Sequence, residues 1–268
     1  MAKSNIEWTD YTINPVTGCT KISDGCKNCY AEKMHKRLQK MGHKKYEFDF
    51  SDVVIYREEL NKIAKIKKPS KIFIGSMADV FHEKVDDFDL EMMMLDIEKY
   101  PQHIFQFLTK RPERMLNFFN DYYDEYLCPL LHHPNIWLGV SVCNKSELLK
   151  IDILKSIEHV PVKFISFEPL LEDVGELDLT GIDWVIVGGE TGAGAREMKP
   201  KWVLNILEQC VFKKISFFFK QWGSFTMKNG GEKIHSIKPY YGYGLNLEDI
   251  KQIPITIPKN KGELKNER

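Results

Sequence analysis

The sequence predicts an α/β protein built from repeated strand–helix units, with about six to seven parallel strands. Six short apolar runs, rich in β-branched and aromatic residues, alternate with longer amphipathic stretches. Continuous apolar runs of this length are typical of strands buried on both faces. Each run also ends in polar or otherwise unusual residues, and in such folds the carboxyl ends of the strands form the active site. We expect an open or closed parallel barrel, with a doubly wound sheet as the alternative.

The expected elements follow one another regularly along the chain. The strands are predicted at 8–13, 71–75, 103–108, 135–140, 162–167, 183–187 and 215–219. Amphipathic patterns predict helices at 89–99, 111–123, 145–157 and 202–210. From residue 226 onward the chain is richer in Gly, Lys and Pro and ends in a highly charged stretch. We therefore expect a barrel domain over 1–225 and a C-terminal appendage with a solvated tail over 226–268.

Composition argues against several classes of protein. The 268 residues include 38 basic and 38 acidic side chains, so the chain is neither a strongly basic nucleic-acid binder nor an acidic disordered protein on bulk charge. No hydrophobic run follows the first residues and no apolar stretch reaches ~18 residues, so neither a signal peptide nor a membrane span is expected. Six cysteines in a chain of this length do not form a disulfide scaffold. We expect a cytoplasmic protein in a reducing environment.

Three cysteines near the N-terminus are the most informative feature. Cys19, Cys26 and Cys29 have the spacing C-x6-C-x2-C, with no fourth cysteine nearby. Thiolates are soft ligands that bind iron–sulfur clusters or zinc. Three thiolates on a four-iron cluster leave one iron open to a small molecule, which indicates chemistry rather than a closed structural site. The alternative is a zinc site completed by His35, although the helical pattern that begins near Tyr30 is expected to turn His35 toward solvent.

Polar side chains at the strand ends are candidates for the same site. Lys110 and Arg111 would clamp a carboxylate or phosphate, or else lie in solvent at the start of a helix. Glu168 is a candidate general acid–base, or one half of an ion pair with Lys220 at the barrel rim. The residues expected to face one cavity beside the cysteines are Asp79, Lys110, Ser141, Glu168, Glu190 and Lys220.

Two basic stretches, 33–45 and 62–71, are candidates for a rim that binds a phosphorylated substrate or nucleic acid. The alternative is that both are solvated helix faces. Of the other cysteines, Cys128 and Cys210 are expected to be structural.

Several stretches of the chain form a recognisable set of motifs. They are NPVTGCTK at 14–21, GCKNCYAE at 25–32, LTKRPER at 108–114, DWVIVGGE at 183–190 and FFKQWG at 218–223, together with 4–9, 76–82, 137–142 and 168–171. In these stretches the chain resembles a family of phage- and prophage-associated proteins of unknown function. Members of the family look like radical S-adenosylmethionine (SAM) enzymes. The resemblance implies a partial (β/α) barrel that holds a [4Fe–4S] cluster on Cys19, Cys26 and Cys29. The open iron would bind SAM, and an external electron donor would drive its cleavage to a 5′-deoxyadenosyl radical.

The chain departs from the wider radical SAM superfamily in two respects. The superfamily's usual spacing is C-x3-C-x2-C, so the first gap is longer here. An aromatic residue often precedes the last cysteine, where this chain has Asn28, and Tyr30 is a candidate substitute. In the family pattern an acidic residue is common at the position of Cys143. This thiol is either a hydrogen-atom donor to a substrate radical or a small buried apolar residue.

The residues that would contact the cofactor follow from the resemblance and from position. Gly188-Gly189-Glu190 is similar to the superfamily's motif for the SAM amino group, but it lies on a late strand, and by position Ser76, Met77 and Asp79 are better candidates. The full set of cofactor-binding candidates is Tyr30, Ser76, Met77, Asp79, Ser141, Gly188, Gly189 and Glu190. The catalytic candidates are Lys110, Cys143 and Glu168. The substrate expected from the basic stretches is a nucleotide or a nucleic acid.

Overall fold

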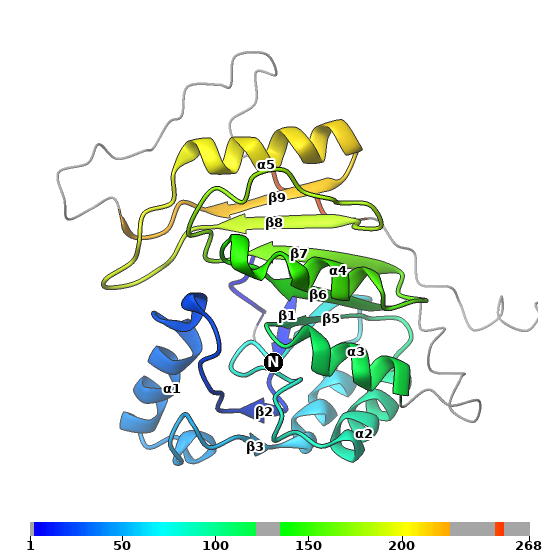
Figure 1. Ribbon diagram of the computed structural model, residues 1–268. Helices are drawn as coiled ribbons and strands as arrows, with labels where there is room; N and C mark the ends of the chain where they lie inside the picture. The colour runs from blue at the N-terminus through cyan, green and yellow to red at the C-terminus, as the bar shows by residue number, and fades with distance from the viewer. Residues whose placement is uncertain (1–2, 122–134, 226–249, 255–268) are drawn as a thin grey trace, which may run out of the picture.

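Seven parallel strands form a single curled sheet in the computed structural model, which describes residues 3–121, 135–225 and 250–254. The strands are Tyr11–Ile13 (β1), Lys71–Ile74 (β4), Ile104–Thr109 (β5), Ile136–Ser141 (β6), Val162–Phe167 (β7), Trp184–Gly188 (β8) and Ser216–Gln221 (β9). Their order in space is the order in which they follow along the chain. In a doubly wound sheet the spatial order of the strands would reverse partway along the chain. The order here does not reverse, so that alternative is wrong. The predicted partial barrel is confirmed (Figure 1).

The predicted helices are present, with shifted ends. Helices α2 (Asp87–Glu98), α3 (Pro112–Asp121), α4 (Leu149–Lys155) and α5 (Pro200–Lys213) cover the outer face of the sheet (Figure 1). Helix α2 begins where Asp86 accepts a hydrogen bond from the Asp89 amide, a side-chain cap for an otherwise unpaired helical N–H. Across the parts of the chain that the structure describes, none of the helices has both the length and the apolar composition needed to traverse a bilayer.

The connection between β1 and β4 is long and carries the cysteines. It contains a two-stranded antiparallel sheet of Val16–Thr17 (β2) and Val54–Ile55 (β3), helix α1 (Tyr30–Lys40) and the 3₁₀ segment η3 (Arg57–Lys65). Figure 1 shows the arrows of β7, β8 and β9 ending on the side where α1 lies. The small sheet was not predicted, because two-residue strands give no detectable periodicity. The first strand is also shorter than predicted, beginning at Tyr11 rather than Trp8.

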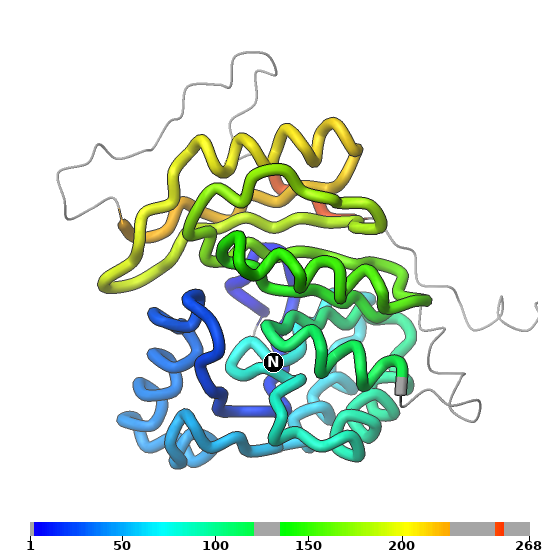
Figure 2. Tube along the Cα trace, in the orientation of Figure 1, coloured from blue at the N-terminus to red at the C-terminus, as the bar shows by residue number. Residues whose placement is uncertain are grey.

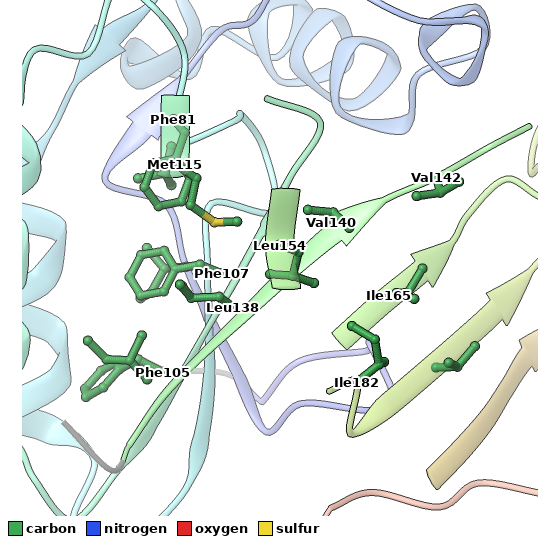
Figure 3. Packing of buried hydrophobic residues seen from close by; sticks show 14 of the residues in the cluster. Phe81, Phe105, Phe107, Met115, Leu138, Val140, Val142, Leu154, Ile165 and Ile182 are labelled. Carbon is green, nitrogen blue, oxygen red and sulfur yellow. The ribbon is translucent and has the colours of Figure 1, made fainter. Parts of the chain in front are cut away.

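Both faces of the sheet are buried, which explains the continuous apolar runs. Outward-facing residues such as Phe105, Phe107, Leu138 and Ile165 pack against the helices (Figure 3). The concave face holds a second, largely aromatic cluster that includes Trp8, Phe73, Trp137, Phe164, Trp184 and Phe218. Trp8 lies before β1 and packs within this cluster, with its ring centroid 6.0 Å from that of Trp184. Sequence reasoning had placed Trp8 in the strand itself.

Polar side chains lie between the aromatic cluster and the carboxyl ends of the strands, as the alternation of side chains along a strand requires. Side chains two residues apart share a face of a strand. In steps of two toward the carboxyl ends, the concave face presents Leu108 after Gln106 and Gly139 after Trp137, and then polar side chains; after Phe164 and Phe218 the polar side chains follow directly. These residues are Lys110, Ser141, Ser166, Glu168 and Lys220. The apolar floor and the polar carboxyl edge are therefore two levels of one surface.

The predicted C-terminal appendage lies mostly outside the described residues, as does Cys128. Of this region the structure describes 250–254, where Ile250 is buried and Lys251 forms an antiparallel bridge with Phe218 of β9. This short piece therefore packs on the last strand.

Replacing Gly139 with Ala will destabilise the fold. An added Cβ would lie 2.4 Å from ring atoms of Phe164 on the concave face. Overpacking of this kind typically costs ~1–3 kcal/mol of unfolding free energy. Urea denaturation of Gly139→Ala should show this loss, and the double variant Gly139→Ala/Phe164→Leu should show a smaller penalty than the two single changes added together. Strict additivity would contradict the proposed clash.

Candidate functional site

A loop from Gly18 to Cys29, which we call the cysteine loop, runs along the carboxyl edge of the sheet. Gly18 pairs in a parallel bridge with Ala78, just after β4. Only glycine fits at this position, because its φ is +81° and a Cβ would overlap the Asp52 carbonyl at 2.0 Å. The thiols of Cys19, Cys26 and Cys29 are free and half-buried. Figure 2 shows this blue segment near the yellow-green chain that follows β8.

Arg111 holds the first half of the cysteine loop. Its guanidinium donates to the Thr20 carbonyl (3.1 Å) and hydroxyl (2.9 Å) and to the Cys19 sulfur (3.6 Å). The Thr20 hydroxyl also lies 2.8 Å from Nε2 of His82. Arg111 is 4% exposed, so the alternative that placed its charge in solvent is wrong. It serves as an anchor for the loop, which we call the Arg111 anchor.

Asp79 orders the end of β5 beneath this anchor. Its carboxylate accepts hydrogen bonds from the Thr109 hydroxyl (2.7 Å) and the Lys110 amide (2.9 Å), and it lies 3.4 Å from Nη1 of Arg111. The Phe81 amide also donates to it. Both carboxylate oxygens are thus engaged within the protein. The prediction that Asp79 contacts a cofactor stays a prediction, while its contacts give it a structural task.

Glu190 holds the second half of the cysteine loop. Its buried carboxylate accepts from the Asn28 side-chain amide (2.9 Å) and from the amide (2.8 Å) and guanidinium (2.5 Å) of Arg196. Arg196 also donates to the Asp24 carbonyl at 2.9 Å. The sequence gives no sign of these contacts, because Asn28 lies 162 residues from Glu190 and Arg196 lies 172 residues from Asp24. We call this group the Glu190 anchor.

Lys110 lies under the middle of the loop, next to thiols. A Cβ added to Gly25 would lie 2.2 Å from the Cys143 sulfur and 3.4 Å from Cε of Lys110, so the backbone of Gly25 packs directly on both side chains. Within the described ranges, the Lys110 ammonium has neither a hydrogen-bond acceptor nor an ion-pair partner. Burial lowers the pKa of Lys110, but the neighbouring Cys143 and Cys26 groups raise it, and the net shift is upward. A cation is therefore held beside two cysteines.

The thiols differ in acidity. Burial raises the pKa of Cys26, but the hydrogen bond with the Ile22 backbone and the charge of Lys110 lower it, and the net pKa falls below the usual value. Burial raises the pKa of Cys19 more than Arg111 lowers it. Burial also raises the pKa of Cys143 to about 11, although Lys110 acts in the opposite direction. Cys143 is thus a protonated, fully buried thiol, which agrees with the apolar alternative and keeps an S–H bond intact.

Glu168 and Lys220 form an ion pair of 2.8 Å across the concave face, as the rim alternative predicted. The Ser166 hydroxyl donates to the same carboxylate. Gly188 lies between them on β8, where a Cβ would come within 2.7 Å of the Glu168 carboxylate. At Gly189 a Cβ would overlap the Trp222 carbonyl at 2.0 Å. Both glycines therefore have packing reasons to be present.

The remaining candidates lie around this edge. The Ser141 hydroxyl donates to the Glu168 carbonyl. The hydroxyl of Ser76 and the amide of Met77 both donate to the side-chain oxygen of Asn14, at 3.0 and 3.1 Å. Asn14 was part of the sequence pattern but had been given no role. Its carbonyl oxygen fixes the turn after β4, because one acceptor binds two successive donors.

Tyr30 and His35 occupy opposite sides of α1. Tyr30 is 58% exposed, next to Cys29. His35 is 1% exposed, so the expectation that it faces solvent is wrong. Its Nε2 lies 2.9 Å from the Phe48 carbonyl, and its ring packs edge-on against Tyr46 and Phe50. The helix turns this residue toward the 46–50 segment, which was not predicted to fold back.

Three cysteine thiols are the right kind of ligand for a metal centre. In the part of the chain that the structure describes, they are not grouped closely enough to form one. The three cysteines are free thiols on one loop, and a cation lowers the pKa of Cys26. Among residues 3–121, 135–225 and 250–254, no three His, Cys, Asp or Glu side chains are grouped closely enough to hold a metal ion. Convergence of Cys19, Cys26 and Cys29 on one centre therefore stays a prediction.

Fold and site define a curled α/β half-barrel with a three-cysteine loop along its carboxyl edge. The chain belongs to the family described as protein of unknown function DUF5131, which it matches over residues 3–262. A comparison with curated proteins gave no match.

Among solved structures the chain is similar to spore photoproduct lyase complexed with dinucleoside spore photoproduct, with 12% identity, a TM-score of 0.44, and coverage of 78% of this chain and 63% of that chain. It is also similar to a point mutant of the same lyase, with 12% identity, a TM-score of 0.45, and coverage of 80% and 64%. The chain thus spans less than two thirds of these proteins. Values this low say nothing about activity.

Replacing Glu190 with Gln will loosen the second half of the cysteine loop. Hydrogen bonds to a charged group contribute ~1.5–3 kcal/mol, so we expect Cys26 and Cys29 of the iron-free protein to alkylate about tenfold faster. Cys19 should change little, because the Arg111 anchor holds it separately. Peptide mass spectrometry after iodoacetamide treatment measures all three rates. Glu83→Gln, which alters the exposed partner of Arg111, is the matched control. Equal acceleration at all three cysteines would contradict two separate anchors.

Replacing Lys110 with Met will raise the pKa of Cys26. The thiolate is the reactive form, and Lys110 favours it. The alkylation rate of Cys26 in Lys110→Met should therefore rise only at higher pH than in the unmodified protein. Cys19 should keep its pH profile, because burial and Arg111 dominate its pKa. An unchanged Cys26 midpoint would show that Lys110 does not act on this thiol.

Proposed function

We propose that this protein is a radical SAM enzyme in which Cys19, Cys26 and Cys29 hold a [4Fe–4S] cluster. The observation that carries the proposal is a loop of three free thiols, anchored at both ends along the carboxyl edge, with Lys110 beside it. Thiolates are the ligands that such clusters take. The carboxyl edge is where α/β barrels place their chemistry.

The cluster, when bound and reduced by an external electron donor, would supply the one electron that cleaves SAM to methionine and a 5′-deoxyadenosyl radical. Residues of the protein orient the loop, balance its charge and exclude water. The Arg111 and Glu190 anchors orient the two halves of the loop. The ammonium of Lys110 offsets negative charge from the thiolates or from an anionic ligand beside them. The aromatic cluster on the concave face closes the floor against water, which protects reactive species.

The remaining candidates receive roles that fit their geometry. Ser76 and Met77, fixed by Asn14, offer polar groups beside the loop for the cofactor, together with Tyr30 and Ser141. Asp79, Gly188, Gly189 and Glu190 have packing or hydrogen-bonding contacts that support this region, and their contact with the cofactor stays a prediction. Glu168, paired with Lys220, holds a carboxylate at the concave face that exchanges a proton with a substrate hydroxyl.

Cys143 is suited to a different task. Its thiol is protonated at neutral pH, and hydrogen-atom donation requires an intact S–H bond. The hydrogen atom would pass to a substrate radical and leave a thiyl radical on Cys143. The Gly25 backbone and Lys110 lie against this residue, next to the cysteine loop.

The zinc alternative is less well supported. His35, its proposed fourth ligand, already contacts the Phe48 carbonyl and is packed between two aromatic rings. No other observation favours zinc.

Replacing Cys26 with Ala will abolish both iron binding and SAM cleavage, because two thiolates hold a cluster poorly. Anaerobic reconstitution with iron and sulfide should give the unmodified protein a brown colour, absorbance near ~400 nm and, after reduction with SAM present, 5′-deoxyadenosine. Cys210→Ala, which changes a buried thiol in α5, should behave as the unmodified protein does. Equal iron in Cys26→Ala, or a colourless protein with stoichiometric zinc, would overturn the proposal.

A further inference from the structure

Positive charge is concentrated in one segment of an otherwise neutral chain. Residues 20–46 include eight Lys and Arg but two acidic residues, against 38 of each sign in the whole sequence. Glu32 pairs with both Lys21 and Lys36, and Lys45 pairs with Glu59. The other cations of the segment have no ion-pair partner among the residues that the structure describes. They are Lys27, Lys33, Arg37, Lys40 and Lys44.

Three of these cations share one exposed face of α1. Lys33, Arg37 and Lys40 follow at steps of four and three residues, which places them in a row along the helix. Like charges at such steps destabilise a helix by ~0.2–0.5 kcal/mol per pair. A helix face that serves only solubility would relieve this with acidic residues at the same steps. The helix dipole favours Arg37 and Lys40, which lie in the last turn of α1, but it does not favour Lys33 in the first turn. An anion lying over the row would stabilise all three charges.

An aromatic ring begins the same row. Tyr30 precedes Lys33 by three residues and Arg37 by seven, so it lies on the same face, and it is 58% exposed. The row starts beside the candidate site, because Tyr30 follows Cys29 and the Lys33 ammonium lies 3.2 Å from where a Cβ of Gly192 would be. Gly192 belongs to the loop after β8 that also carries Glu190. From there the row extends ~15 Å along the helix.

We propose that this α1 stripe, defined as Tyr30, Lys33, Arg37 and Lys40, binds a single strand of DNA or RNA and leads it to the cysteine loop. Cations that follow a phosphate backbone and an exposed ring on which a base stacks are the two components of single-strand binding. A base paired within a duplex has no free face for Tyr30, so the stripe favours unpaired strands. The statement that the bound nucleic acid is a substrate rests on the proposed function. Binding of the nucleic acid to the α1 stripe does not require the iron–sulfur cluster.

The second basic stretch provides a matched control. Lys65, Lys67 and Lys68 are exposed like the stripe, but they precede β4 and therefore lie toward the amino edge of the sheet. The two stretches meet at Glu59, which pairs with both Lys45 and Lys62, but Lys65, Lys67 and Lys68 lie beyond that contact. The expectation that both stretches form one rim stays a prediction. The triple variants Lys33→Glu/Arg37→Glu/Lys40→Glu and Lys65→Glu/Lys67→Glu/Lys68→Glu change net charge equally at the two ends of the strands.

Fluorescence anisotropy of the iron-free protein with labelled oligonucleotides of about 20 residues tests the proposal. Single-stranded DNA, single-stranded RNA and duplex DNA are titrated at about 50 and 200 mM salt. We expect at least one single strand to bind more tightly than duplex. The stripe variant should lose about tenfold or more in affinity, and its log–log salt slope should flatten by about 2, at ~0.7 per phosphate contact. Tyr30→Ala should weaken single-strand binding, and the control triple variant should bind as the unmodified protein does.

Several outcomes would overturn the proposal. These are no binding at low salt, equal losses in the two triple variants, duplex binding as tight as single-strand binding, or equal binding of polyglutamate, which would show a surface for any polyanion. Preference between the DNA and RNA strands identifies the polymer. The iron content of the stripe variant is measured in parallel and should be unchanged. A failure of strand binding with normal iron would therefore leave the proposed cluster standing, and a failure of iron binding would leave the stripe standing.

Discussion

The organisation of this site depends on two buried charges that hold one loop from opposite sides. Arg111 comes from the end of the third strand of the sheet and Glu190 from the end of the sixth, and each binds a different half of the cysteine loop. A buried charge is stable only when its partners satisfy it, and removing one partner leaves the other uncompensated. Both charges are satisfied by groups of the loop and its neighbours. The loop and the carboxyl edge therefore stabilise each other.

This arrangement couples the cysteines to the completeness of the sheet. Cys26 and Cys29 lie in the first strand–helix unit, while the carboxylate that fixes their segment follows β8, 162 residues after Asn28. The pairing of β4 to β8 makes this contact less costly, because it shortens the loop that the contact would otherwise have to close. The thiols are thus positioned only in the folded protein. Before that stage they lie on an unanchored chain.

The sequence was sufficient for the fold and for the neighbourhood of the site, but not for its contacts. Strands buried on both faces leave long apolar runs, so β4 to β9 were predicted within about two residues. The position of Lys110 and Glu168 at the strand ends followed from the same pattern. The partners of Glu190, Arg111 and Asn14 could not be predicted, because a hydrogen bond between distant polar residues leaves no periodic signal. His35 was placed wrongly for a related reason: helical periodicity marks the faces of α1, and the 46–50 segment that covers one face has no pattern of its own.

Lys110 differs from the two anchoring charges because no ion-pair partner for its ammonium lies in the part of the chain that the structure describes. Binding and folding are therefore coupled. An anion that binds beside Lys110 in the folded protein, but not in the unfolded chain, raises the free energy of unfolding by RT ln(1 + [L]/Kd). Burial alone would lower the pKa of Lys110, but the negative charge of Cys143, Cys26 and Asp79 outweighs burial, so the pKa lies above its usual value. Thiolate formation at Cys26 and anion binding at Lys110 are therefore competing ways to satisfy the same charge. A metal centre that keeps the cysteines as thiolates would therefore weaken the binding of a further anion beside Lys110.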